Sequence, residues 1–211
     1  MSKKDPTAPG VAREVEQSGA LCLAFANSAA PRTDGRRSAK ADLWLPLRGY
    51  DDLVVWGQRT GILGAFDGER LTRAAAVHPD RAAVVFGRGF ELRAALLRIF
   101  TALAAGRQPR PKDLEILNGV LAESLPARRV VPGTDGFRWD WGGDGDALDR
   151  VLWPVVHSAG DLLTSADHRL LRQCAGSGCR RLFIGRNRRR LWCDMNVCGS
   201  RSKRRRHRSP V

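Results

Sequence analysis

Four of the five cysteines in this sequence form two pairs of equal spacing, and these pairs constrain the fold more than any other feature. They are Cys174 and Cys179, then Cys193 and Cys198, with thirteen residues between the pairs. Zinc takes four ligands in a tetrahedron, and each closely spaced pair lets the chain turn around the ion and offer two thiolates. We therefore expect these four cysteines to bind one zinc ion. Since they leave no position open for water, the zinc would be structural and not catalytic.

Two other interpretations of the cysteines stay open, namely a chance arrangement and an iron–sulfur cluster. Zinc is favoured because the spacing of the two pairs matches. A segment this small has no core of its own, so we expect metal binding and folding to be one event. Cys22 stands alone in an apolar stretch, which predicts a small buried core residue.

The net charge of +14 is concentrated near the C-terminus. From Asp167 onward, fourteen Lys and Arg residues face two acidic residues. A neutral body with a basic arm is typical of proteins that bind polyanions, namely DNA, RNA or anionic lipid, although a solvated, disordered tail has the same composition. Trp192, beside a ligand cysteine, is expected to pack over the small module, with stacking on a base as the alternative. The side chains expected to contact nucleic acid are Arg186, Arg188, Arg189, Arg190, Arg201, Lys203, Arg204, Arg205, Arg206 and Arg208.

Apolar periodicity in the remainder of the chain predicts a helix-rich α+β domain with one β-hairpin. The finger after it is expected to be of the treble-clef or zinc-ribbon kind and to end in a basic helix. The predicted divisions are a disordered lead (1–17), the α+β domain (18–166) and the zinc module (167–211). Helices are expected over 21–26, 53–61, 79–106, 111–121 and 147–164, the last with a kink at Pro154, and the hairpin over 128–141; residues 31–40 are expected to be a loop.

The sequence offers little support for catalysis. The four histidines are scattered, and no nucleophile motif or phosphate-binding glycine loop is present, so we expect the protein not to be an enzyme. His157 is expected to be a hydrogen-bonded core residue. Trp139 and Trp141 share one face of a strand, which favours core packing, with a small effector pocket beneath the hairpin as the alternative. No stretch is long and apolar enough to span a membrane, so we expect a soluble cytoplasmic protein.

The C-terminal residues resemble a known motif. They are Cys174 and Cys179, Leu182-Phe183, Arg186-Asn187, Arg190, Trp192-Cys193, Met195, Cys198-Gly199-Ser200-Arg201, Lys203 and Arg208. This pattern resembles the CGNR zinc finger of bacterial proteins whose N-terminal ABATE domain is named for stress-induced transcription regulation. A weaker resemblance to that domain lies in the stretch 21–27, which ends in Asn27, and at Leu117-Asn118. Ser200 departs from the signature asparagine, and the linker after Phe183 is shorter and lacks the usual acidic residue.

The resemblance implies a sensor-like body joined to a DNA-binding finger with the four cysteines as zinc ligands. We therefore expect a transcription regulator, with an effector that the sequence does not identify. RNA or ribosome binding, and docking on an acidic protein such as part of the transcription machinery, are the alternatives. A homodimer is left open because many DNA readers bind paired half-sites.

Overall fold

The computed structural model describes residues 12–28, 47–134, 136–142 and 145–208. The predicted loop 31–40 and residues 1–11 lie outside these ranges. No helix in the described ranges is long and apolar enough to cross a membrane.

The body consists mainly of helices, with one pair of strands. Its elements are α1 (Ala12–Ser18), α2 (Leu21–Asn27), α3 (Tyr50–Arg59), α4 (Ala65–Val77), α5 (Pro79–Ala104), α6 (Pro111–Ser124), the 3₁₀ turn η1 (Leu125–Ala127), the strands β1 (Arg128–Gly133) and β2 (Gly136–Trp141), the 3₁₀ turn η2 (Leu148–Val151) and α7 (Trp153–Thr164).

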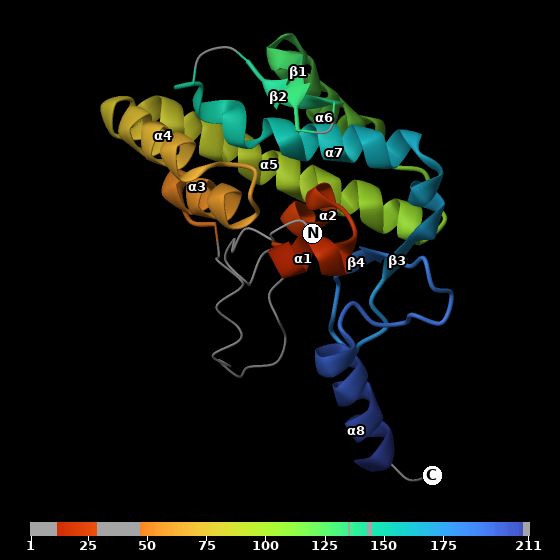
Figure 1. Ribbon diagram of the computed structural model, residues 1–211. Helices are drawn as coiled ribbons and strands as arrows, with labels where there is room; N and C mark the ends of the chain where they lie inside the picture. The colour runs from red at the N-terminus through yellow and green to blue at the C-terminus, as the bar shows by residue number, and fades with distance from the viewer. Residues whose placement is uncertain (1–11, 29–46, 135, 143–144, 209–211) are drawn as a thin grey trace.

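A cluster of four helices forms the centre of the body. The longest helix, α5, lies in contact with α2 and α6, and both of these also pack against α7 (Figure 1). Apolar side chains recur along α5 at helical spacing and fill the space between these helices, among them Leu92, Leu96 and Phe100. The pair α3 and α4 packs on α5 near its N-terminal end. The helix-rich α+β architecture expected from the sequence is confirmed.

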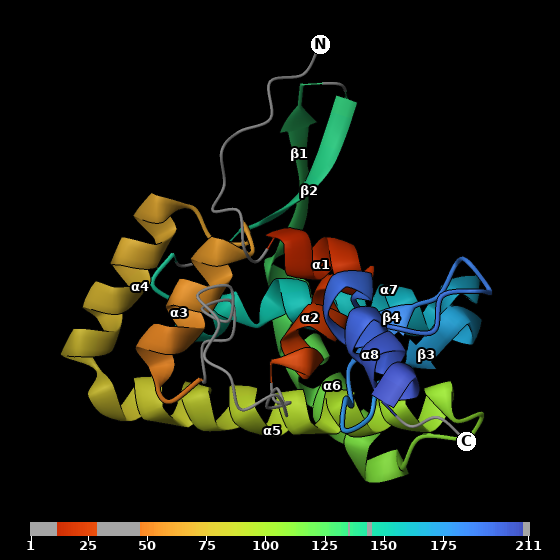
Figure 2. The same cartoon turned by 90° about the horizontal axis from the view of Figure 1, so that it is seen from below.

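The antiparallel hairpin β1–β2 stands out from the helices (Figure 2). Its register pairs Arg128 with Trp141 and Val130 with Trp139. Trp141 is half-buried and lies 5.7 Å from the ring of Trp153. Trp139 is 59% exposed, so the expected core packing of both indoles is wrong for this residue. The reason is that the hairpin extends past the helices, and the guanidinium of Arg128 covers the Trp139 ring at 4.2 Å instead.

Three parts of the body differ from the sequence-based expectations. The lead was expected to be disordered to residue 17, yet α1 occupies Ala12–Ser18. The helix expected over 147–164 is divided into η2 and α7, because Pro154 lies in the first turn of α7, where its missing N–H costs nothing, and begins the helix without kinking it. Helix α4 was not predicted, because its buried side of Gly68, Leu71 and Ala75 contains only one large apolar side chain.

The zinc module follows α7 through the 3₁₀ turn η3 (Ala166–Leu170). It consists of the two-stranded sheet β3 (Leu171–Gln173) and β4 (Leu182–Ile184), a π-helical turn η4 (Met195–Gly199) and the terminal helix α8 (Ser200–Arg208). Its hairpin is not separate from the body, because Leu171, Leu182 and Ile184 are buried in the same apolar core as the helices. Figure 1 shows α8 extending away from the body.

Candidate metal centre and nucleic-acid interface

The four paired cysteines converge on one point. The sulfur atoms of Cys174, Cys179, Cys193 and Cys198 all lie within 4.8 Å of one another. The Sγ atoms of Cys193 and Cys198 are 3.7 Å apart, and those of Cys179 and Cys193 are 3.8 Å apart. Zinc–sulfur bonds of about 2.3 Å in a tetrahedron place the sulfurs about 3.8 Å apart. The cysteines therefore have the spacing of a four-thiolate zinc site, as the sequence predicted.

Local backbone geometry positions the first pair of cysteines. The turn between them closes through a hydrogen bond from the Cys179 N–H to the Gly176 carbonyl, and Gly178 takes a φ of 72°, which favours glycine. The Cys174 sulfur accepts hydrogen bonds from the backbone N–H groups of Gly176 and Cys193, at 3.4 and 3.3 Å. Hydrogen bonds from the neighbouring thiols, Cys179 first, lower the pKa of Cys174 well below its usual range, whereas the same cluster of thiols raises the pKa of Cys193 and of Cys198. The local hydrogen bonds therefore favour the thiolate at Cys174.

The second pair is joined directly to the terminal helix. Asp194 caps the π-turn, because its Oδ1 accepts from the N–H groups of Asn196 and Val197 at 2.8 and 3.1 Å. Cys198 lies in that turn, and α8 begins two residues later at Ser200. Trp192 is half-buried against the cysteine cluster, and its indole N–H donates to Ser202 Oγ on α8 at 3.1 Å. The expected packing role of Trp192 is confirmed.

Among the ten basic residues predicted to contact nucleic acid, Arg186, Arg190, Arg201 and Arg205 have an interaction partner within the described residues. The Arg190 guanidinium lies over the Phe183 ring at 4.4 Å and donates to the carbonyls of Cys193 and Gln17, each at 2.7 Å. Arg190 therefore holds the finger together and ties it to α1. Arg186 forms an exposed ion pair with Asp167 at 2.7 Å.

Arg188, Arg189, Lys203, Arg204 and Arg205 form an exposed basic surface. Arg205 on α8 donates to Ser177 Oγ, in the turn between Cys174 and Cys179, at 2.8 Å, and Arg201 also has an interaction partner. Within the described residues, the side chains of Arg188, Arg189, Lys203 and Arg204 are exposed and have no ion pair or hydrogen bond. Arg206 and Arg208 lie within α8. The surface thus offers unpaired positive charge from both the loop and α8.

A buried asparagine, for which the sequence suggested no role, joins the body to the finger. Asn27 at the end of α2 donates to the Leu182 carbonyl at 2.9 Å and accepts from the Leu182 N–H at 2.8 Å. Its amide also donates to Ser18 Oγ at 3.1 Å. A second link joins the Gln17 amide to Asp194 Oδ2 at 3.2 Å. The side chain of Asn27 thus makes the same pair of backbone hydrogen bonds with Leu182 of β4 that a neighbouring strand would make.

The remaining cysteine and the buried histidine are structural. Cys22 is fully buried, its thiol donates to the Ser158 carbonyl at 3.5 Å, and burial raises its pKa to about 12. His157 Nδ1 accepts from the Arg128 guanidinium at 2.7 Å, which leaves Nε2 to donate to Ser124 Oγ at 3.1 Å. The expectation of a satisfied core histidine is confirmed.

A helix-rich α+β domain that shares its core with a four-cysteine finger defines the class of this protein. The family model ABATE, described as "Putative stress-induced transcription regulator", matches residues 19–166, and the CGNR zinc finger model matches residues 170–209. The chain therefore belongs to the ABATE family and carries a CGNR zinc finger, whose four cysteines are positioned to bind a single structural zinc ion. No curated protein matches the sequence.

Proposed function

We propose that this protein is a transcription regulator, without catalytic activity, that binds duplex DNA through the helix α8 and through the loop 186–190 between the two cysteine pairs. The observation that carries the proposal is the placement of α8. It is a helix without acidic residues, it extends from the body into solvent, and its N-terminal end is fixed at the metal centre (Figure 1). The family descriptions support the same function.

The shape and charge of α8 suit binding in the major groove of DNA. The major groove admits a single α-helix, whose arginines can reach phosphates on both sides and the acceptor edge of guanine. Lys203 and Arg204 are exposed and unpaired within the described part of α8, so binding them to phosphate breaks no internal contact. The zinc site lowers the cost of binding because it orders the start of the helix in advance.

The test is a titration of a labelled DNA duplex at two or more salt concentrations with wild type and Lys203→Gln/Arg204→Gln. Loss of two phosphate contacts predicts weaker binding and a reduction of about 2 in the slope of log affinity against log salt. The matched control is Arg107→Gln/Arg110→Gln, which removes the same charge from exposed positions between α5 and α6 in the body. Equal weakening by both variants would contradict a specific role for α8.

Competition by single-stranded DNA and structured RNA completes the test. We expect duplex DNA to compete best. Tighter binding to structured RNA would favour an RNA-binding function, and weak binding to all three would favour an adaptor that docks on an acidic protein surface.

A further inference from the structure

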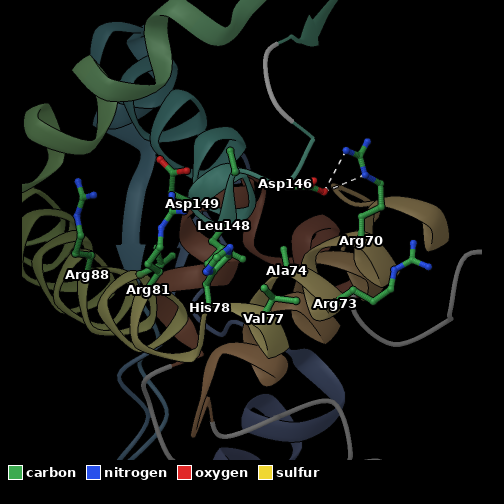
Figure 3. Close-up of a pocket in the computed structure, with 12 residues that line it drawn as sticks. Arg70, Arg73, Ala74, Val77, His78, Arg81, Arg88, Asp146, Leu148 and Asp149 are labelled. Atoms are coloured by element: carbon green, nitrogen blue, oxygen red, sulfur yellow. Dashed lines mark hydrogen bonds and ion pairs between the residues drawn. The ribbon is translucent and has the colours of Figure 1, made fainter.

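A second basic site lies in the body, away from the metal centre. A cavity of about 790 Å³ is bounded by α4, the start of α5 and the η2 segment (Figure 3). This volume is in the range that holds a small organic ligand. Its position differs from the pocket considered beneath the β1–β2 hairpin. We propose that this cavity binds an organic phosphate of nucleotide size, and that this ligand is the effector of the domain.

Charge in the cavity favours a multivalent anion. Four arginines line it, Arg70 and Arg73 from α4 and Arg81 and Arg88 from α5, against the acids Asp146 and Asp149. Each acid already has a partner. Arg70 pairs with Asp146 at 3.1 Å, as the dashed lines in Figure 3 show, and Asp149 accepts from the Trp153 indole at 3.1 Å.

The arginines that remain supply the site for the anion. Arg88 pairs with Glu123 of α6. Arg73 and Arg81 have no ion pair or hydrogen bond within the described part of the chain. Two unpaired guanidinium groups from adjoining helices suit a ligand with two or more negative charges, since guanidinium binds phosphate oxygens through paired hydrogen bonds. His78 lies between these arginines in sequence, at the junction of α4 and α5, and also lines the cavity.

Apolar groups on the cavity wall argue against a bare inorganic anion. Ala74 and Val77 from α4, Val85 from α5 and Leu148 from η2 form this part of the lining. Val77 is 70% exposed, so a ligand that covers it gains apolar burial. A nucleotide combines the planar apolar body and the clustered negative charge that the two kinds of lining group require.

The experiment is hydrogen exchange of the full-length zinc-loaded protein with ATP, tripolyphosphate or adenosine as the probe. We expect ATP to slow exchange in α4, the first turns of α5 and η2. Tripolyphosphate lacks the apolar body and adenosine lacks the charge, so each should protect these segments less at equal concentration. The change Arg73→Gln/Arg81→Gln should raise the ATP concentration needed for the same protection by about tenfold or more, because each arginine supplies charge-assisted hydrogen bonds.

The control is Arg107→Gln/Arg110→Gln, which removes two exposed arginines after the other end of α5. This variant should retain the ATP protection of α4. Protection by ATP confined to α8 and the finger would overturn the proposal, since it would show that the basic tail binds any polyanion. Equal protection by tripolyphosphate, or an equal loss in both variants, would also overturn it.

Discussion

At the scale of single residues, the side chain of Asn27 has the largest predicted effect on how the two parts of the protein stay together. It is buried and forms two hydrogen bonds with the backbone of Leu182 in the finger. Asn27→Ala should leave a buried N–H and carbonyl without partners, which lowers the free energy of unfolding by about 2–4 kcal/mol. Urea unfolding of the variant measures this change.

The control for Asn27 is Asn118→Ala, at an exposed position on α6. It should change the free energy of unfolding by less than about 0.5 kcal/mol. Similar values for the two variants would show that the Asn27–Leu182 pairing does not stabilise the protein.

His157 provides a prediction about pH. Desolvation by burial and the nearby Arg128 lower its pKa in the folded protein. The unfolded chain therefore binds the proton more readily, and the stabilisation is present above the unfolded pKa of about 6.5 and is lost as pH falls toward the folded value. Urea unfolding at pH 7.5 and 5.5 should show a smaller decrease for His157→Gln than for wild type. The same decrease in both proteins would exclude His157 as the source.

At the scale of secondary structure elements, the finger divides into a part held by the body and a part held by zinc. The strands β3 and β4 contribute Leu171, Leu182 and Ile184 to the body's core, whereas α8 begins at the second cysteine pair. A chelator should therefore speed hydrogen exchange in η4 and α8 while β3 and β4 stay protected. Simultaneous loss of protection in β3, β4 and α8 would show that the whole module unfolds as one unit.

The same elements show what the sequence could predict. The many large apolar side chains that recur along α5 and the turn between β1 and β2 are local features of the sequence, so these elements were predicted. Helix α4 was missed because alanine and polar residues fill most of its length. The exposure of Trp139 depends on where the hairpin lies relative to the helices, which alternation along one strand does not determine.

At the scale of the whole molecule, the zinc ligands were predictable and the docking of the finger was not. Cysteine spacing directly encodes the tetrahedral site. The pairing of Asn27 with Leu182 joins residues 155 positions apart, and no local pattern indicates it. Arg190 likewise lies in a basic run of the sequence, and no local pattern indicates its hydrogen bond to the Gln17 carbonyl. Because these contacts fix the finger on α1 and α2, the proposed effector site in the body has a packed connection to α8, the helix that we propose binds DNA.

We propose that one zinc ion orders the basic helix α8 and that this helix binds DNA. The most direct test combines the zinc content of wild type, Cys193→Ser and Cys22→Ala with a titration of each on duplex DNA at two salt concentrations. We predict one zinc ion per chain and tight, salt-sensitive binding for wild type and Cys22→Ala. Cys193→Ser should lose zinc and bind DNA at least tenfold more weakly, because α8 is no longer ordered. Loss of zinc with DNA binding unchanged would contradict the account and show that the arginines act as an unstructured tail.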